Sequence, residues 1–297
     1  MKQSFTYYLT LLVIKLKGLK KNFSKDPIDF KRIRKEDVYH PKGRFFKQHI
    51  TKRFKVLDSE VTEIKKENTP NKLLLFVHGG AFISGPGQHH WDTIKVIAKQ
   101  TDYTIWMCNY PKAPEYNISE ISNNIDAIYI KALEEYKSSH IVLIGDSVGG
   151  TLITALTQRL ISIKKQLPNK VILVSPVMDA TMSNPDIEKV DTIDPMISKK
   201  GILSAKKMCA GTIDLKNQMI SPIYGSFEQF PDTILFLGEL DITYPDQKLA
   251  VDILKAAQVN IKIIEGKNMP HIWPFLPIMK EAKLSLNQII EELNTKT

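Results

Sequence analysis

The segment Gly145-Asp-Ser-Val-Gly149 contains the residues whose types and spacing most directly suggest chemistry. An apolar run at 141–144 precedes it, and a helix-forming pattern follows from Thr151. A G-x-S-x-G sequence between a strand and a helix is typical of a nucleophile elbow, a sharp turn that exposes the serine hydroxyl at the strand end. The glycines permit the strained turn, and the N-terminus of the following helix favours developing negative charge. This pattern predicts that Ser147 is a nucleophile.

A serine nucleophile needs a base, and the chain offers one histidine in the required place. Where the elbow is found, the partners follow in the order serine, acid, histidine. Of the seven histidines, only His271 comes after Ser147. It follows an apolar run at 261–264 and precedes a helical segment, so a loop can carry its imidazole toward the serine. We therefore expect His271 to be the base.

The acidic partner is less constrained by the sequence. Asp241 follows the apolar run at 233–237, and Asp179 follows the preceding run at 171–174. Glu239 and Asp246 lie close to Asp241 in the sequence. We favour Asp241, with Asp179 as the main competitor, because the last strand before His271 most readily places a carboxylate beside its ring.

A second glycine-rich loop follows the first strong apolar run, at 73–77. Its sequence, His78-Gly-Gly-Ala-Phe82, is close to the HGGG-type loop whose backbone amides form part of an oxyanion hole. Glycines here let the backbone approach a substrate and direct amides into open space. The loop is a candidate site for binding a developing oxyanion.

The elements that must position these residues form an alternating pattern. Short apolar runs at 73–77, 104–107, 141–144, 171–174, 233–237 and 261–264 are separated by segments long enough for helices, which we place at 91–100, 118–136, 151–163 and 275–293. Such alternation predicts an α/β fold whose mostly parallel sheet is covered by helices on both faces, with ligands bound at the carboxyl ends of the strands. Segments at 46–56 and 61–64 predict an antiparallel entry to this sheet. The stretch 181–224, with an apolar pattern at 197–208, is too long for a simple loop and predicts an insertion above the sheet.

Composition and charge exclude several classes of protein. The chain has 297 residues, a net charge of +9 and two cysteines, Cys108 and Cys209, which form neither a disulfide framework nor a C-x-x-C motif. Residues 1–55 contain 16 Lys or Arg against 4 Asp or Glu, whereas residues 56–297 contain 25 against 28. The body is therefore slightly acidic and lacks the basic, aromatic patches of a nucleic-acid-binding protein. A reducing cytosol is the simplest compartment.

The basic N-terminus also carries an apolar stripe if it is helical. Phe5, Leu9, Leu12, Leu16, Leu19 and Phe23 recur at steps of four and three, and Lys15, Lys17, Lys20 and Lys21 flank them. The apolar part is too short to span a bilayer. The main expectation is a helix packed on the domain. Peripheral contact of residues 1–23 with an anionic membrane and a secretory signal are the alternatives.

Four motifs together resemble the bacterial hormone-sensitive-lipase-like esterases of the α/β-hydrolase fold. They are the 78–82 loop, Tyr110-Pro-Lys-Ala-Pro-Glu115, the 145–150 elbow, and Gly238-Glu-Leu-Asp241 followed by His271. They occur in the order of that family and cover residues from about 72 to 297. The 110–115 motif matters most to the identification, because generic α/β-hydrolases lack it.

The resemblance implies a triad of Ser147, Asp241 and His271. It also implies an oxyanion hole built from the amides of Gly80, Ala81 and Val148, with Gly79 shaping the loop. A helical cap is expected from residues 1–43, above a hydrolase domain of residues 44–297 that carries a cap insertion at about 181–224. Ala81 and Val148 replace the usual glycine and alanine, and residues 242–246 depart from the usual D-P-L pattern after the acid.

The predicted reaction is hydrolysis of small-molecule carboxylic esters, with short to medium acyl chains, through an acyl-enzyme on Ser147. No metal or organic cofactor is called for, and no nucleic-acid partner is expected. An amide hydrolase similar to an arylformamidase and a membrane-associated lipase remain alternatives. A non-catalytic ligand receptor on the same fold is disfavoured because His271 is present. We expect a cytoplasmic protein with a possible peripheral membrane contact, and the sequence leaves the oligomeric state open.

Overall fold

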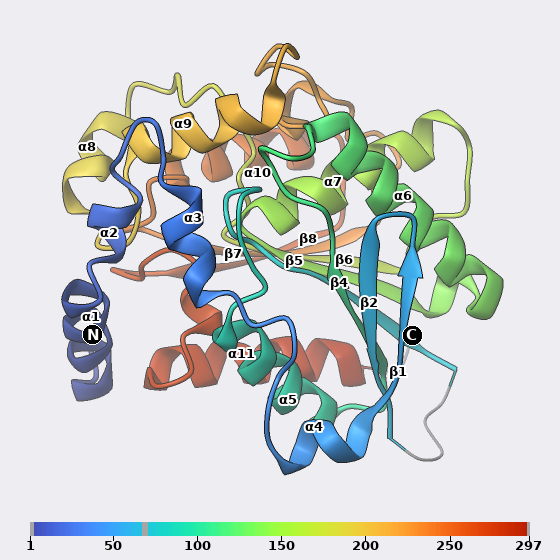
Figure 1. Ribbon diagram of the computed structural model, residues 1–297. Coiled ribbons are helices and arrows are strands. Elements are labelled where there is room, and N and C mark those ends of the chain that lie inside the picture. Colours follow the sequence, from blue (N-terminus) through green and yellow to red (C-terminus); the bar gives the residue numbers. More distant parts are fainter. Residues whose placement is uncertain (1–2, 67–70, 296–297) are drawn as a thin grey trace.

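The computed structural model describes residues 3–66 and 71–295, and a mixed sheet forms its centre (Figure 1). The order of its eight strands is β1-β2-β4-β3-β5-β6-β7-β8. The strands are β1 (Ile50–Val56), β2 (Ser59–Ile64), β3 (Leu73–Val77), β4 (Thr104–Asn109), β5 (Ile141–Asp146), β6 (Lys170–Val174), β7 (Asp232–Gly238) and β8 (Ile261–Gly266). β2 pairs antiparallel with β1 and β4, and all the other neighbours are parallel.

Helices cover both faces of this sheet. Figure 1 shows α5 and α11 on one face and α6, α7 and α10 on the other. The longer helices are α1 (Phe5–Leu16), α5 (Gln88–Gln100), α6 (Ile118–Glu135), α7 (Val148–Ser162), α9 (Lys199–Ala210), α10 (Tyr244–Ala256) and α11 (Lys280–Asn294). The shorter ones are α2 (Leu19–Asn22), α3 (Phe30–Ile33), α4 (Arg44–His49) and α8 (Ile187–Ile193), with 3₁₀ turns η1 (Arg34–Glu36), η2 (Ser138–His140), η3 (Pro222–Tyr224) and η4 (Trp273–Phe275).

The parallel strands and the long helices follow from local sequence. Every residue of β3 and β5 is buried, as their continuous apolar runs predict for strands covered on both faces. Asn117 caps α6 by accepting from the amides of Ser119 and Glu120, and the Glu120 side chain accepts from the Asn117 amide. The predicted fold class, a mostly parallel sheet between helices, is confirmed.

The predicted strand at 46–56 starts too early, because residues 44–49 form helix α4. The spacing of Phe46 and Ile50 fits a helix turn as well as a strand. Aromatic contacts favour the helix: Phe46 packs edge-on against Trp91 with ring centroids 5.7 Å apart, and within the helix Phe45 stacks on His49 one turn later at 4.4 Å. The rest of this predicted strand lies within β1, and the strand predicted at 61–64 lies within β2.

The last helix begins at Lys280, five residues after the predicted start near 275. Pro274 and Pro277 account for this difference. A proline disfavours the helical conformation of the residue before it, and Leu276 is accordingly extended, with φ of −93° and ψ of 96°. Residues 273–275 form only a 3₁₀ turn.

The stretch 181–224 contains α8, α9 and η3, and it packs against the N-terminal segment. The Phe23 carbonyl accepts a hydrogen bond from the Ser198 hydroxyl, and the Ile28 amide donates to the Ser204 hydroxyl. Gly201 permits this packing, since a Cβ there would lie 1.8 Å from the Phe23 carbonyl oxygen. The N-terminal segment and the 181–224 stretch are thus in direct contact.

The N-terminal apolar stripe does not continue along one helix. Gly18, with φ of 63°, separates α1 from α2, so Leu19 and Phe23 pack on the core while Phe5 and Leu16 remain exposed. The buried side chains of α1 are Tyr7, Thr10 and Ile14. The helix therefore packs on the domain, as expected, but through the face opposite to the predicted stripe. None of the helices in the described ranges combines the length and apolarity that crossing a membrane requires.

Candidate active site

Ser147 lies in a strained turn between β5 and α7. Its φ of 51° and ψ of −124° are unfavourable for a residue with a side chain. Gly149 lets α7 approach β3 closely, because a Cβ at this position would lie 2.0 Å from the Val77 carbonyl oxygen. A Cβ at Gly145 would lie 2.6 Å from the Gly149 backbone. The two glycines of the motif thus permit the close packing that maintains the turn.

A continuous chain of hydrogen bonds joins Ser147, His271 and Asp241. The Ser147 Oγ lies 2.9 Å from Nε2 of His271, and Nδ1 of the same ring lies 2.8 Å from Oδ2 of Asp241. Asp241 follows β7, and His271 lies between β8 and η4. All three side chains are buried. The structure therefore brings together the three residues that the sequence singled out, from three different strand ends.

The surroundings of the Asp241 carboxylate and the His271 imidazole shift the two pKa values in opposite directions. Burial raises the pKa of Asp241, but the His271 charge and hydrogen bonds from His271 and Thr243 outweigh it, so the pKa lies below its usual value. Burial lowers the pKa of His271, but the adjacent Asp241 carboxylate outweighs it and holds the pKa above its usual value. The other donor to Oδ2 of Asp241 is the Gln247 side-chain amide, at 3.1 Å. The carboxylate is thus ionised and held in one orientation.

The competing acids are engaged elsewhere. The Asp179 carboxylate accepts hydrogen bonds from the Thr181 amide and hydroxyl and from the Tyr224 hydroxyl. Glu239 accepts from the Asn268 amide. Neither carboxylate has a hydrogen bond with His271 in the described part of the chain.

The loop after β3 lies beside the elbow, since a Cβ at Gly79 would be 2.9 Å from that of Ser147, and it contains two unpaired amides. Gly80 has φ of 117°, and Ala81 and Phe82 have φ of 55° and 64°. The Gly79 amide donates to Oδ1 of Asp146 at 3.0 Å, so this amide is used to hold the loop. Within the described residues, the amides of Gly80 and Ala81 donate no hydrogen bond. The Val148 amide opens α7, where the first amides of a helix have no partner inside it.

His90 and Asp146 secure this loop, and the sequence analysis singled out neither of them. His90 lies on α5, and its Nε2 contacts Asp146 at 3.2 Å. The Gly87 amide donates to Nδ1 of His90, so Nε2 carries the ring proton and donates to the carboxylate. Asp146 therefore links His90 to the Gly79 amide, and through it the helix α5 to the loop. The pair of histidines at 89 and 90 was visible in the sequence, but nothing in its spacing indicated this contact.

A third missed residue, Asp194, connects the 181–224 stretch to the acid. Its Oδ2 accepts from the amide of Ile242, the residue after Asp241, and its Oδ1 accepts from Met196 and Ile197. Burial and the Asp241 charge raise its pKa to about 7, against the lowering effect of these three amides. The Asp194 carbonyl also accepts from the Lys20 ammonium of the N-terminal segment, at 2.8 Å. Asp194 thus connects the loop that carries Asp241 to the 181–224 stretch and, through Lys20, to the N-terminal segment.

His89, His90 and Asp146 are grouped closely enough to be considered as metal ligands. The hydrogen bonds of His90 argue against this interpretation. Its Nδ1 accepts from an amide and its Nε2 donates to Asp146, so neither ring nitrogen has a lone pair free for a metal. The group is better explained as the hydrogen-bonded support of the loop.

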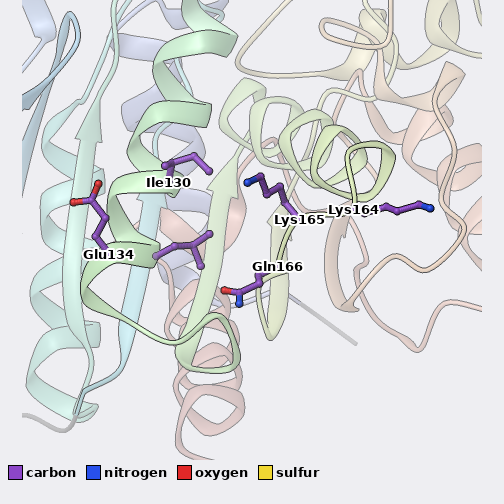
Figure 2. Close-up of a pocket in the computed structure, with 6 residues that line it drawn as sticks. Ile130, Glu134, Lys164, Lys165 and Gln166 are labelled. Carbon is purple, nitrogen blue, oxygen red and sulfur yellow. The ribbon is translucent and has the colours of Figure 1, made fainter.

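A surface hollow lies far from these residues, between α6 and the end of α7 (Figure 2). Its lining includes Ile130 and Glu134 of α6, and Lys164, Lys165 and Gln166. α7 starts beside Ser147 and has 15 residues, so its far end lies about 22 Å from the serine. The hollow therefore cannot contribute to binding at Ser147.

Comparison with known proteins identifies the family to which the chain belongs. A family model of the α/β hydrolase fold matches residues 74–275, and the chain belongs to this family. An esterase of Acinetobacter venetianus is 28% identical over 235 residues, covering 77% of each chain. Esterase LipU of Mycobacterium tuberculosis is 26% identical over 235 residues, covering 76% of this chain and 78% of its own.

Solved structures show the same fold over nearly the whole chain. A Staphylococcus aureus protein described as a candidate esterase is 26% identical, with a TM-score of 0.86 over 96% of this chain and 99% of its own. An esterase of the bacterial hormone-sensitive lipase family, 23% identical, has a TM-score of 0.85 over 99% and 98%. The predicted fold and the predicted resemblance are confirmed, and ester hydrolase is the class of enzyme to which these matches assign the chain.

Proposed function

We propose that the protein is a serine hydrolase that cleaves carboxylic esters through an acyl-enzyme on Ser147. The observation that carries this proposal is the unbroken hydrogen-bond chain from Asp241 through His271 to the Ser147 hydroxyl. A serine is a weak nucleophile on its own, and an oriented neutral imidazole is the group that activates it. No cofactor is needed for this reaction.

In the proposed mechanism His271 acts first as a base and then as an acid. Nε2 accepts the Ser147 proton as Oγ attacks the ester carbonyl, and the same nitrogen then protonates the leaving alcohol. Asp241 keeps the proton on Nδ1 and stabilises the imidazolium as it forms. Water then repeats the sequence on the acyl-enzyme and releases the acid.

The oxyanion of each tetrahedral intermediate is proposed to bind the amides of Gly80, Ala81 and Val148. Their lack of partners within the described residues supports this role, because an amide without a protein acceptor is free to donate to the oxyanion. Gly79 shapes the loop, and its amide is committed to Asp146. One such donor typically contributes about 10² to 10³ in turnover.

Residues 1–43 and the insertion at about 181–224 are proposed to form the cap over the hydrolase domain. Their mutual contacts, and the bond between Asp194 and the Ile242 amide beside Asp241, support this assignment. Val148 is buried directly after the proposed nucleophile, and we propose that its side chain, larger than that of alanine, narrows the space for an acyl group. Short to medium acyl chains are therefore the proposed substrates.

Turnover of nitrophenyl esters of increasing chain length tests the proposal. Ser147→Ala is expected to abolish hydrolysis while the thermal unfolding midpoint stays close to that of the wild type. Ser162→Ala, at the other end of α7, is the matched control and should keep full turnover. Undiminished hydrolysis by Ser147→Ala would refute the proposal. Faster turnover of the corresponding anilides than of the esters would instead favour an amide hydrolase.

A further inference from the structure

Helix α1 presents a row of large apolar side chains to solvent. Phe5 is 80% exposed, Leu12 52% and Leu16 78%, and Tyr8 and Leu9 are exposed on the same side. With a turn of 3.6 residues, these positions share one face of the helix. Soluble proteins rarely leave such a group of apolar residues uncovered unless it binds something.

This face is held outward by contacts on the other side of the helix. The Tyr7 hydroxyl donates to the Asn268 carbonyl at 2.8 Å, and Tyr7 and Ile14 are buried in the core. Ser4, which caps the helix, bonds to the Glu281 carboxylate through its amide and its hydroxyl. The apolar face therefore belongs to a helix that is anchored to the domain.

The chain segment that carries this face is strongly basic. Residues 1–25 contain six lysines and no Asp or Glu. Lys15, Lys17 and Lys21 are exposed at the end of the apolar row. An apolar face with lysines at one end is complementary to an anionic lipid surface, which takes up both the apolar side chains and the positive charges.

A second copy of the chain is a less suitable partner for this face than an anionic lipid surface. A 12-residue helix is about 18 Å long and about 10 Å wide, so its footprint is about 180 Å², against about 800 Å² per partner in a standard interface. Pairing two such faces would also bring two sets of lysines together, and their repulsion opposes association.

We infer that α1 docks on anionic membrane surfaces through its face of Phe5, Tyr8, Leu9, Leu12 and Leu16, with Lys15, Lys17 and Lys21 binding the headgroups. The inference does not rest on the proposed ester hydrolysis.

Vesicle co-sedimentation tests this inference. The full chain carrying Ser147→Ala is used, so that binding is measured without any hydrolysis of lipid. We expect binding to vesicles of equal phosphatidylglycerol and phosphatidylcholine, weaker binding to phosphatidylcholine alone, and further weakening as salt is raised. Failure of the esterase proposal would leave these results unchanged.

Two triple variants separate the contributions of the apolar side chains and of the lysines to vesicle binding. Phe5→Ser/Leu12→Ser/Leu16→Ser is expected to lose at least tenfold in affinity for the mixed vesicles. Lys15→Gln/Lys17→Gln/Lys21→Gln is expected to lose about 100-fold, at about a factor of five per lysine. The matched controls, Ile130→Ser/Ile163→Ser/Leu249→Ser and Lys137→Gln/Lys165→Gln/Lys255→Gln, alter exposed residues elsewhere and should bind as the parent does.

Thermal unfolding and light scattering complete the test. Each variant should keep the unfolding midpoint of the parent within a few degrees, since the altered side chains are exposed. Absence of vesicle binding by the parent, or equal loss in the control triples, would overturn the inference. A dimer that dissociates in the Phe5, Leu12 and Leu16 triple variant would overturn it in favour of a second copy.

Discussion

Replacement of Asp241 by asparagine tests the proposed mechanism most sharply. In the structure Oδ2 of Asp241 lies 2.8 Å from Nδ1 of His271, and both groups are buried. At this separation two unit charges interact by about 6 kcal/mol for an effective dielectric constant of about 20. At about 1.4 kcal/mol per factor of ten, the carboxylate accelerates the formation of the imidazolium by about 10⁴-fold. Asp241→Asn should lower kcat by about this factor.

The neighbouring donors explain why the asparagine cannot replace the carboxylate. The Thr243 amide and hydroxyl both donate to Oδ1 of Asp241. In the variant both donors will hydrogen-bond to the single side-chain oxygen of the asparagine. The new amide nitrogen then faces His271 and donates to Nδ1. The ring proton moves to Nε2, which can no longer accept the proton of Ser147.

The assay is kcat and KM on a short-chain nitrophenyl ester, with the unfolding midpoint as the check on folding. Asp179→Asn is the control, because Asp179 has bonds to Thr181 and Tyr224 and none to His271 in the described part of the chain. The control should keep kcat within tenfold of the wild type. A loss of less than tenfold in folded Asp241→Asn, or an equal loss in folded Asp179→Asn, would refute the reasoning.

Two further predictions concern the base and the elbow. Burial lowers the pKa of His271, but Asp241 outweighs burial and raises this pKa above 6.5. Because only the neutral ring accepts a proton, kcat/KM should fall as the pH drops through a midpoint above 6.5. In Asp241→Asn the pH profile of the residual activity should show a midpoint below 6.5. Gly149→Ala would place a Cβ 2.0 Å from the Val77 carbonyl oxygen. We therefore expect lower turnover and a loss of about 1–3 kcal/mol in the free energy of unfolding, measured with urea. Unchanged stability would contradict the close packing of α7 on β3.

Most of the sheet and half of the site could be predicted from local sequence. The parallel strands are continuous apolar runs, and a run that is buried on both faces needs no distant information to be recognised. Ser147 was singled out from the glycines at 145 and 149, and the structure shows that a Cβ at either position would collide with neighbouring backbone. His271 was identified because no other histidine follows Ser147.

Other features depended on contacts between distant segments. The sequence left Asp179 as a competitor of Asp241, and only the packing of the 181–224 stretch shows that Asp179 is occupied by Thr181 and Tyr224. His90 and Asp194 carry no local motif, and their contacts with Asp146 and the Ile242 amide arise only when separate elements meet. Such residues cannot be recognised by spacing alone.

The N-terminal helix illustrates the same limit. Its apolar periodicity predicted a helix correctly, but periodicity does not say which face meets the domain. Tyr7 and Ile14 were buried because Tyr7 reaches the Asn268 carbonyl and the helix cap reaches Glu281, and both partners lie more than 250 residues away in the sequence. The sequence by itself thus determined the sheet and singled out Ser147 and His271, the proposed nucleophile and base, since these depend on local backbone and burial preferences. The tertiary structure decided which of the candidate carboxylates bonds to His271, the supports of the loop and the exposed face of α1, since each depends on which distant groups come into contact.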